Sequence, residues 1–300
     1  MGVKLDDDGN PVSVNDYVIE RMLGQGGFGT TYLARRGEDH YALKATEKEM
    51  AKNEYAVMKR LRGLCHHHVL CPIELIRSPQ TYYLVSEYVE GTDLGTYATR
   101  GASALVTTTF VHQLILQMLD ALSALHLIGV AHCDVKPPNI MVSPRRTHFT
   151  LIDFGVSTTH ARRVLGGTAL YISPQLYELR AENKLIKMVD LQACDLFALA
   201  VSFYEVLHSG RYPFRVTDRS ISTNTPVSDS GTGPVVQPYA LEDVRFISSP
   251  KATPWMEELF VLLTVLNHRE LNAIELYHAV RSRAYGKITE MLLEWPEQPY

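Results

Sequence analysis

The chain has 300 residues, of which 46% are hydrophobic and 21% are charged, and its formal net charge is −4 at pH 7. These values are ordinary for a soluble globular enzyme and allow either one large domain or two lobes. The charge is spread through the sequence, so we expect no nucleic-acid-binding surface. No apolar run approaches the length of a membrane span, and the polar, acidic N-terminus does not resemble a signal peptide.

The cysteines lie far apart in the sequence, without CxxC spacing, at Cys65, Cys71, Cys133 and Cys194. Reduced thiols in a cytosolic compartment are a simpler interpretation than disulfides or a zinc site, so we expect a cytoplasmic protein. Met1-Gly2 matches the start of the myristoylation motif, but Asp6 stands where that motif requires Ser or Thr, which disfavours acylation.

The first half of the chain alternates between apolar and polar residues. Residues 1–16 are charged and turn-rich, and we expect a poorly ordered lead-in. From Tyr17 the segments YVIERML, GQGGFGTTYLARR and HYALKAT predict a strand, a tight turn, a strand, a turn and a strand. Further on, ELIRS and TYYLVSEYVEG predict two more strands that lead into a linker.

The turn GQGGFG fits the pattern GxGxxG. In a dinucleotide-binding fold this pattern follows a strand and opens a helix. Here the β-branched and aromatic run TTYLARR follows, which favours a strand–loop–strand arrangement. Backbone N–H groups of such a loop can cover phosphates, and glycines leave the space open. An ordinary glycine hairpin is the alternative.

Lys44 lies near the end of the third predicted strand, where a lysine is usually a surface residue. The following segment Asn53–Leu61 has a helical period and carries Glu54, a possible partner for the lysine. The next segment, LCHHHVLC, contains consecutive histidines. Because side chains in an extended loop point in different directions, we interpret it as a helix-to-strand turn rather than a metal site.

The second half begins with a strongly apolar helix, predicted over residues 107–128, which leads to the loop AHCDVKPPNIMV. That loop presents Asp134, Lys136 and Asn139, and its two prolines prevent a continuing helix. The β-like run TLIDFGV then provides Asp153. Two acids, one amide and one amine suit a metal-bound polyphosphate and a hydroxyl nucleophile.

The loop resembles the HRDxKxxN catalytic loop of eukaryotic-type protein kinases, and Asp153-Phe154-Gly155 resembles the DFG motif of that family. The resemblance extends from about Tyr17 to about Val280. It implies a two-lobed α+β fold with a small antiparallel-sheet lobe containing one helix and a larger, mostly helical lobe. The implied ranges are about 17–88 for the first lobe, 87–91 for a hinge, 92–300 for the second lobe and 216–237 for a flexible insertion rich in Ser, Thr, Gly and Pro.

The resemblance also implies a reaction, the in-line transfer of the ATP γ-phosphoryl group to a Ser or Thr hydroxyl of a protein. Asp134 would orient and deprotonate that hydroxyl, and Lys136 would offset charge on the migrating group. Asn139 and Asp153 would hold Mg²⁺, while Lys44 would position the α- and β-phosphates.

In the family, a helix glutamate braces this strand lysine, and Glu54 matches it here. The separation of the two residues is shorter than the family usually allows, so we expect the leading turns of the helix to be trimmed.

The resemblance also implies a set of nucleotide contacts. Ser86 would wall the back of the adenine pocket, and its small size predicts an unusually deep pocket. Backbone groups of Glu87 and Val89 would bond the adenine edge, and Asp93 could reach the ribose. The implied contacts are Leu23, Gly24, Gln25, Gly26, Gly27, Phe28, Gly29, Thr31, Ala42, Lys44, Ser86, Glu87, Val89, Asp93 and Met141.

Two departures from the family pattern concern regulation. Cys133 stands where many kinases have an arginine that a phosphorylated activation-loop residue neutralises. Val164 occupies the usual phosphosite position and cannot be phosphorylated. Together they predict an enzyme that does not depend on activation-loop phosphorylation, although hydroxyls remain at Ser157, Thr158 and Thr159.

Other positions predict supporting roles. His132 is expected to be structural rather than a general base, and Asp195, at a helix start, is expected to hold the backbone of the catalytic loop. The combination of Thr168 with Lys136 is typical of Ser/Thr kinases, which disfavours a tyrosine-directed or small-molecule kinase.

Further departures leave a rival open. Gln175 replaces a glutamate that the family pairs with a late arginine, for which Arg269 is the nearest candidate, and Phe197 and Ala200 replace Trp and Gly. These changes keep a non-catalytic nucleotide-binding scaffold as the alternative. The oligomeric state is not predicted.

Overall fold

The computed structural model describes residues 2–27, 29–63, 65–79, 81–99, 102–163, 166–216, 239, 244–264 and 272–293. The predicted positions Phe28, Val164 and Arg269, and the predicted insertion from residue 217 onward, lie outside these ranges. The chain divides into two compact units, one of Met1–Glu90 with Asp153–Gly155 and one of Gly91–Ile152 with Val156–Tyr300.

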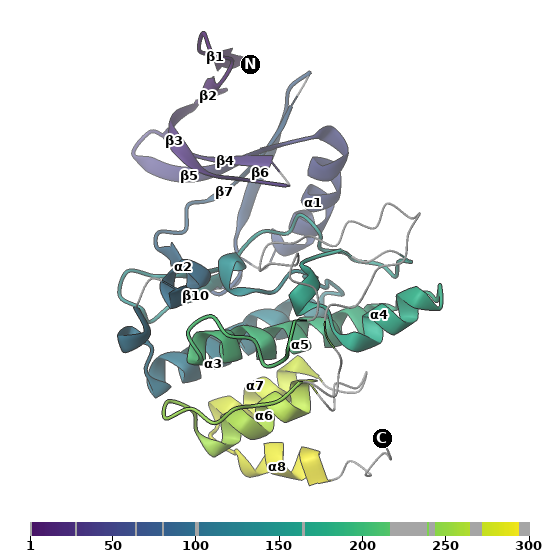
Figure 1. The fold of residues 1–300 in the computed structure, drawn as a ribbon. Coiled ribbons are helices and arrows are strands. Elements are labelled where there is room, and N and C mark those ends of the chain that lie inside the picture. The colour runs from purple at the N-terminus through teal and green to yellow at the C-terminus, as the bar shows by residue number, and fades with distance from the viewer. Residues whose placement is uncertain are drawn as a thin grey trace. The chain divides into compact units, whose positions relative to one another are not determined.

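The first unit is built on an antiparallel sheet with the strand order β1-β2-β3-β4-β5-β7-β6 (Figure 1). The sheet strands are β1 (Val3–Leu5), β2 (Pro11–Val14), β3 (Tyr17–Gly26), β4 (Gly29–Arg36), β5 (Asp39–Thr46), β6 (Pro72–Arg77) and β7 (Tyr82–Glu87). The alternation of the sequence therefore predicted β3 to β7 correctly.

The expected disordered lead-in is wrong, because β1 and β2 form a hairpin and β2 continues the sheet through the pair Val14–Tyr17. The carboxylate of Asp6 accepts the N–H groups of Asp8 and Asn10, which closes the turn between the two strands. Val14 and Tyr17 are fully buried in the core of this unit, so the hairpin is anchored by packing.

The helix of the first unit, α1 (Lys48–Leu61), begins two residues after β5 ends. It therefore starts five residues before the predicted segment. Its buried side chains recur at helical spacing, and they are Ala51, Glu54, Val57, Met58 and Leu61. Only Glu47 separates β5 from α1, which contributes to the short separation between Lys44 and Glu54. The expected trimming of the leading turns stays a prediction.

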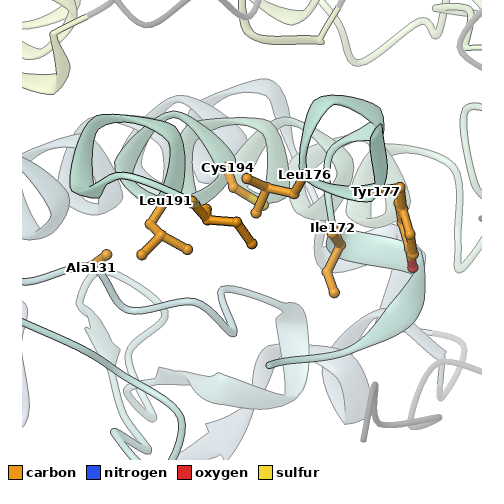
Figure 2. Packing of buried hydrophobic residues seen from close by; sticks show 7 residues of the cluster. Ala131, Ile172, Leu176, Tyr177, Leu191 and Cys194 are labelled. Atoms are coloured by element: carbon orange, nitrogen blue, oxygen red, sulfur yellow. The ribbon is translucent and has the colours of Figure 1, made fainter. Parts of the chain in front are cut away.

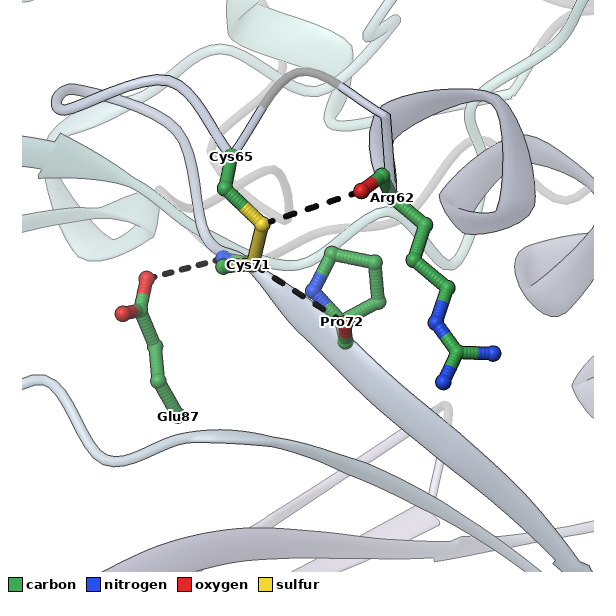
Figure 3. The surroundings of a disulfide bond; sticks show 5 residues. All are labelled: Arg62, Cys65, Cys71, Pro72 and Glu87. Carbon is green, nitrogen blue, oxygen red and sulfur yellow. Dashed lines mark hydrogen bonds between the residues drawn. A yellow bond between two sulfur atoms is a disulfide. The ribbon is translucent and has the colours of Figure 1, made fainter.

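The turn between α1 and β6 contains a disulfide between Cys65 and Cys71, whose Cα atoms lie 5.0 Å apart (Figure 3). The interpretation of four reduced thiols is wrong for this pair, whereas Cys133 and Cys194 are free. The N–H of Cys71 donates to Oε1 of Glu87 at 2.8 Å, and the N–H of Glu87 donates to the carbonyl of Cys71 at 3.1 Å. The turn is thus bonded to the end of β7.

The second unit is mostly helical. Its helices are α2 (Leu94–Thr99), α3 (Thr108–Leu127), α4 (Pro174–Ala181), α5 (Met188–Leu207), α6 (Pro254–Thr264), α7 (Ala273–Arg281) and α8 (Gly286–Leu293), with 3₁₀ turns at Ala102–Leu105, Pro137–Asn139 and Ala169–Tyr171. A small antiparallel sheet has the order β10-β9-β8, from strands β8 (Thr92–Asp93), β9 (Ile140–Val142) and β10 (Phe149–Leu151).

The predicted long helix is confirmed as α3, which the side chain of Thr107 caps by accepting the N–H of Phe110. Among the described residues, α3 is long and apolar enough to cross a membrane, contrary to the expectation from the sequence, but 61% of its most apolar window is buried inside the protein. The core helix of a soluble protein shows the same combination.

Helix α5 lies at the core of the second unit and is buried along nearly its whole length. Figure 2 shows Leu191 and Cys194 of this helix beside Leu176 and Ile172 from the segment around α4. Ala131, the first residue of the predicted catalytic loop, belongs to the same cluster. The loop therefore starts from a rigid, apolar base.

Candidate active site

The loop after α3 gathers polar side chains around one carboxylate, that of Asp134. Nδ2 of Asn139 donates to its Oδ2 at 2.9 Å, and Nζ of Lys136 lies 2.9 Å from the same oxygen. Oγ1 of Thr168 donates to Oδ1 at 2.7 Å and accepts from Nζ of Lys136 at 2.6 Å. Asp134 is only 4% exposed, and three donors from two segments of the chain satisfy its carboxylate.

The backbone of this loop is fixed from α5. The carboxylate of Asp195 accepts the N–H of His132 at 2.8 Å and that of Cys133 at 2.7 Å, and lies 3.0 Å from Nε2 of His126. Cys133 has a φ of 65°, which a non-glycine residue rarely adopts, and these bonds stabilise it there. The predicted backbone-holding role of Asp195 is confirmed, although the residue lies in the middle of α5 rather than at its start.

The hydrogen bonds of His132 define its tautomer. Nε2 lies 3.1 Å from the carbonyl oxygen of Ile152, which can only accept, so Nε2 carries the proton. Nδ1 then accepts the N–H of Asp134 at 3.3 Å. The ring is buried and uses both nitrogens within the fold, in agreement with the predicted structural role.

The first unit holds a second charged centre. Nζ of Lys44, on β5, lies 2.9 Å from Oε2 of Glu54 on α1 and 2.7 Å from Oδ1 of Asp153. Burial favours the neutral amine, but the carboxylates of Asp153 and Glu54 outweigh it and raise the pKa of Lys44. The structure therefore forms the predicted pair of Lys44 with Glu54, and adds Asp153 to it.

The glycine turn joins β3 to β4, and Gly26 pairs with Gly29 across it. The predicted strand–loop–strand arrangement is confirmed. Gly29 has a φ of 123°, and a Cβ atom there would lie 2.1 Å from the carbonyl oxygen of Ala45, so only glycine fits. At Gly24, Gly26 and Gly27 a Cβ atom would meet nothing within 4 Å, so the fold itself does not demand glycine at these positions.

The other predicted nucleotide contacts are distributed over both units. In the first unit, Thr31 pairs with Lys44 and Ala42 pairs with Ser86 in the sheet register, while Leu23 is exposed. Ser86 is buried and donates to the carbonyl of Glu87 at 3.3 Å.

In the second unit, the carboxylate of Asp93 accepts the N–H and the hydroxyl of Thr96, each at 2.6 Å, and Met141 lies opposite Asp93 in β9. Asp93 thus already closes the first turn of α2.

Among the described positions that depart from the family pattern, Phe197 and Ala200 are fully buried, whereas Cys133 and Gln175 are partly buried. Burial raises the pKa of the Cys133 thiol, which keeps it neutral. Oε1 of Gln175, on α4, is buried and has no hydrogen-bond partner among the described residues. The sequence indicated Thr168 only as a marker of Ser/Thr specificity and did not reveal its hydrogen bonds with Asp134 and Lys136. The signal was the GGT run, whose glycines allow close approach to the loop.

Comparisons with known proteins agree on the relatives of this chain. The family model described as protein kinase domain matches residues 17–249. Human calcium/calmodulin-dependent protein kinase type 1B is 32% identical over 216 residues, which cover 66% of this chain and 58% of that protein. Serine/threonine-protein kinase PkaB of Streptomyces coelicolor is 29% identical over 218 residues, which cover 66% of this chain and 49% of that protein. The matched region is therefore about half the length of these relatives.

Among solved structures, the Cydia pomonella Granulovirus kinase PK-1 is similar, with a TM-score of 0.64 and 18% sequence identity. The match covers 90% of this chain and 94% of the viral one. At this identity the likeness concerns the fold alone. The predicted two-lobed α+β architecture and the predicted resemblance are both confirmed.

Proposed function

Because the chain belongs to the protein kinase domain family, which it matches over residues 17–249, we propose that it transfers the γ-phosphoryl group of ATP to a Ser or Thr hydroxyl of a protein. The observation that carries this proposal is the buried Asp134 carboxylate with Lys136 and Asn139 against it. The curated relatives described as serine/threonine-protein kinases support the acceptor class.

The contact between Thr168 and Asp134 supports the proposed general base. Thr168 donates its hydroxyl to Oδ1 of Asp134 at 2.7 Å, which is a normal O–H···O⁻ hydrogen bond. A Ser or Thr hydroxyl of a substrate is the same chemical group, so this carboxylate accepts the kind of donor that the reaction requires. Lys136 would offset negative charge on the transferring phosphoryl group.

The Lys44 centre supplies the remaining groups. Lys44 would contact the α- and β-phosphates of ATP, with Glu54 keeping the ammonium in place. Mg²⁺, a hard cation, prefers oxygen ligands, and the carboxylate of Asp153 and the amide oxygen of Asn139 fit that preference. When bound, Mg²⁺ would neutralise charge on the phosphates.

We further propose that turnover does not require a phosphate in the activation segment, which comprises residues 153–175. The partly buried, neutral thiol of Cys133 offers no cation to a phosphate. The start of the segment is already paired with the catalytic loop, because Thr158 and Ala131 exchange two backbone hydrogen bonds of 3.0 Å. A phosphate in this segment that is required for turnover, detected by mass spectrometry, would contradict the proposal. The cytoplasmic location stays a prediction.

The decisive experiment measures transfer of labelled γ-phosphate to a generic basic protein with Mg²⁺, for the wild type and for Asp134→Asn. The variant keeps the size of the side chain but removes the proton acceptor, so we expect turnover to fall by about 10²- to 10⁴-fold while ATP still binds. Phosphoamino-acid analysis then separates Ser and Thr from Tyr.

Nucleotide binding by fluorescence titration is the control for a folded variant. Equal, background-level transfer by both proteins, with ATP bound, would favour the non-catalytic scaffold over the kinase.

A further inference from the structure

The part of the activation segment that belongs to the second unit, from Val156 onward, is attached to its surroundings at several points. Near its start, Oγ of Ser157 donates to the carbonyl of His132 at 2.9 Å, next to the backbone pair of Thr158 with Ala131. Further along, Arg162 and Ile186 exchange two backbone hydrogen bonds of 3.0 and 2.9 Å. The catalytic loop and the stretch before α5 therefore both hold the backbone of this segment.

The side chain of Arg162 turns back onto the segment itself. Its Nη1 donates to the carbonyl of Val156 at 3.1 Å. A Cβ atom built on Gly166 would lie 3.3 Å from Nη1 and 3.4 Å from Nη2, so the guanidinium packs directly on that glycine. Nε is buried without a hydrogen-bond partner among the described residues. A buried unpartnered donor is unfavourable, so this position is not explained by local hydrogen bonding alone.

From Gly166 the chain runs directly to the carboxylate of Asp134. The next residue, Gly167, has a φ of 106°, and a Cβ atom there would lie 2.2 Å from the carbonyl oxygen of Cys133. Gly167 is followed by Thr168, whose hydroxyl bonds both Asp134 and Lys136. A displacement of Gly166 would therefore shift the Thr168 hydroxyl at the proposed general base.

We propose that Arg162 is a positioning residue for the Asp134 centre. Its guanidinium donates a hydrogen bond to Val156 and packs on Gly166, and it thereby fixes the position of the Thr168 hydroxyl. The proposal rests on the proposed kinase function. Arg162 also lies close enough to Cys133 for its charge to oppose the rise that burial causes in the pKa of that thiol.

The test compares Arg162→Met and Arg162→Lys with Arg163→Met. Arg163 is the matched control, because it is the adjacent cation, is exposed, and donates to the carbonyl of Asn183. We expect Arg162→Met to lower kcat by about tenfold while the KM for ATP changes by less than about twofold, since misplacement affects the chemical step. Arg162→Lys can still donate to Val156 and should stay within about threefold of the wild type. Arg163→Met should leave kcat unchanged.

Backbone amide hydrogen exchange gives a second readout that does not need turnover. We expect faster exchange at Thr158, Arg162 and Ile186 in Arg162→Met, but not in Arg163→Met. Equal kcat and equal exchange in the two methionine variants would overturn the proposal. A loss of kcat without faster exchange would also overturn it, because the loss would then not act through the segment. A wild type without turnover would refute the kinase function, and the exchange experiment would still decide the role of Arg162.

Discussion

Each of the two units contains a charged centre, and the central charge is positive in the first and negative in the second. In the first unit a cation, Lys44, lies between the carboxylates of Glu54 and Asp153. In the second unit an anion, Asp134, lies among donors from Lys136, Asn139 and Thr168. Two of those three donors are neutral.

This difference in charge determines which residue of each centre is most sensitive to substitution. In the first, one cation balances two anions, so its loss leaves two carboxylates close together without compensation. In the second, three donors share one anion, so the loss of a neutral donor leaves the ion pair of Lys136 with Asp134 in place. The first centre should therefore depend on Lys44 far more than the second depends on Thr168.

The largest effect is expected for Lys44→Met. The variant leaves Glu54 and Asp153 unbalanced, and we expect kcat/KM to fall by at least about 100-fold and the free energy of unfolding to fall by about 3 kcal/mol at pH 7. Burial raises the pKa of Glu54 and the charge of Lys44 opposes that rise, so removing the ammonium raises this pKa further. The lost stability should therefore partly return as the pH is lowered towards about 5.

For Lys44→Met, steady-state kinetics measure kcat/KM, and urea denaturation at pH 7 and about pH 5 measures the free energy of unfolding. Glu54→Gln is the matched control, because Asp153 still pairs with Lys44 in that variant. A larger loss of stability in Glu54→Gln than in Lys44→Met would show that the centre is not organised around the lysine.

A smaller effect is expected at the second centre. Thr168→Val keeps the shape of the side chain but removes the hydroxyl that bonds Asp134 and Lys136. We expect kcat to fall by about tenfold and stability by about 1 kcal/mol, in line with the loss of one or two hydrogen bonds. Thr168→Ser retains the hydroxyl and should stay within about threefold of the wild type. Equal losses in the two variants would mean that the methyl group, not the hydroxyl, matters.

The smallest effect concerns Glu205, a buried carboxylate on α5 that accepts a hydrogen bond from the hydroxyl of Tyr171. Burial raises its pKa to about 7, although the bond from Tyr171 opposes the rise. Because the folded state binds the proton more tightly than the unfolded state, stability is greatest at low pH and falls as the pH rises through 7. Between pH 6 and 8 the wild type should lose about 1 kcal/mol more than Glu205→Gln.

Denaturant titrations of both proteins at pH 6 and pH 8 measure that difference. Parallel pH dependence in the wild type and Glu205→Gln would show that this carboxyl group does not titrate in the range. The result bears on the comparison of the centres, because Glu205 is a buried carboxylate whose hydrogen-bond donor, Tyr171, is neutral.

Much of the second centre was predictable, because Asp134, Lys136 and Asn139 lie within six residues of each other and two prolines restrict the loop between them. The pair of Lys44 with Glu54 was also predicted, but the start of α1 was not. The first turn, KEMAK, is polar apart from Met50 and Ala51, so periodicity becomes visible only further along the helix.

Features that depend on the conformation of the folded backbone could not be predicted from the sequence. Arg162 has its role only because Val156 and Gly166 approach its guanidinium, and nothing in the residue order shows that approach. The N-terminal hairpin has strands of three and four residues and is held by the capping carboxylate of Asp6 as well as by packing, so its alternation is too short to recognise.

The disulfide between Cys65 and Cys71 makes the attachment of the end of α1 dependent on the oxidation of these two thiols. It closes a ring of seven residues between the end of α1 and the start of β6, and such a ring contributes about 2 kcal/mol to stability. Cys71 is in turn bonded to Glu87 of β7, so the sulfur bridge fastens the helix end to the sheet. Since α1 carries Glu54, reduction of the disulfide would weaken the connection between the end of this helix and the sheet that carries Lys44. The redox potential of the surroundings would then set the fraction of molecules in which this connection is intact.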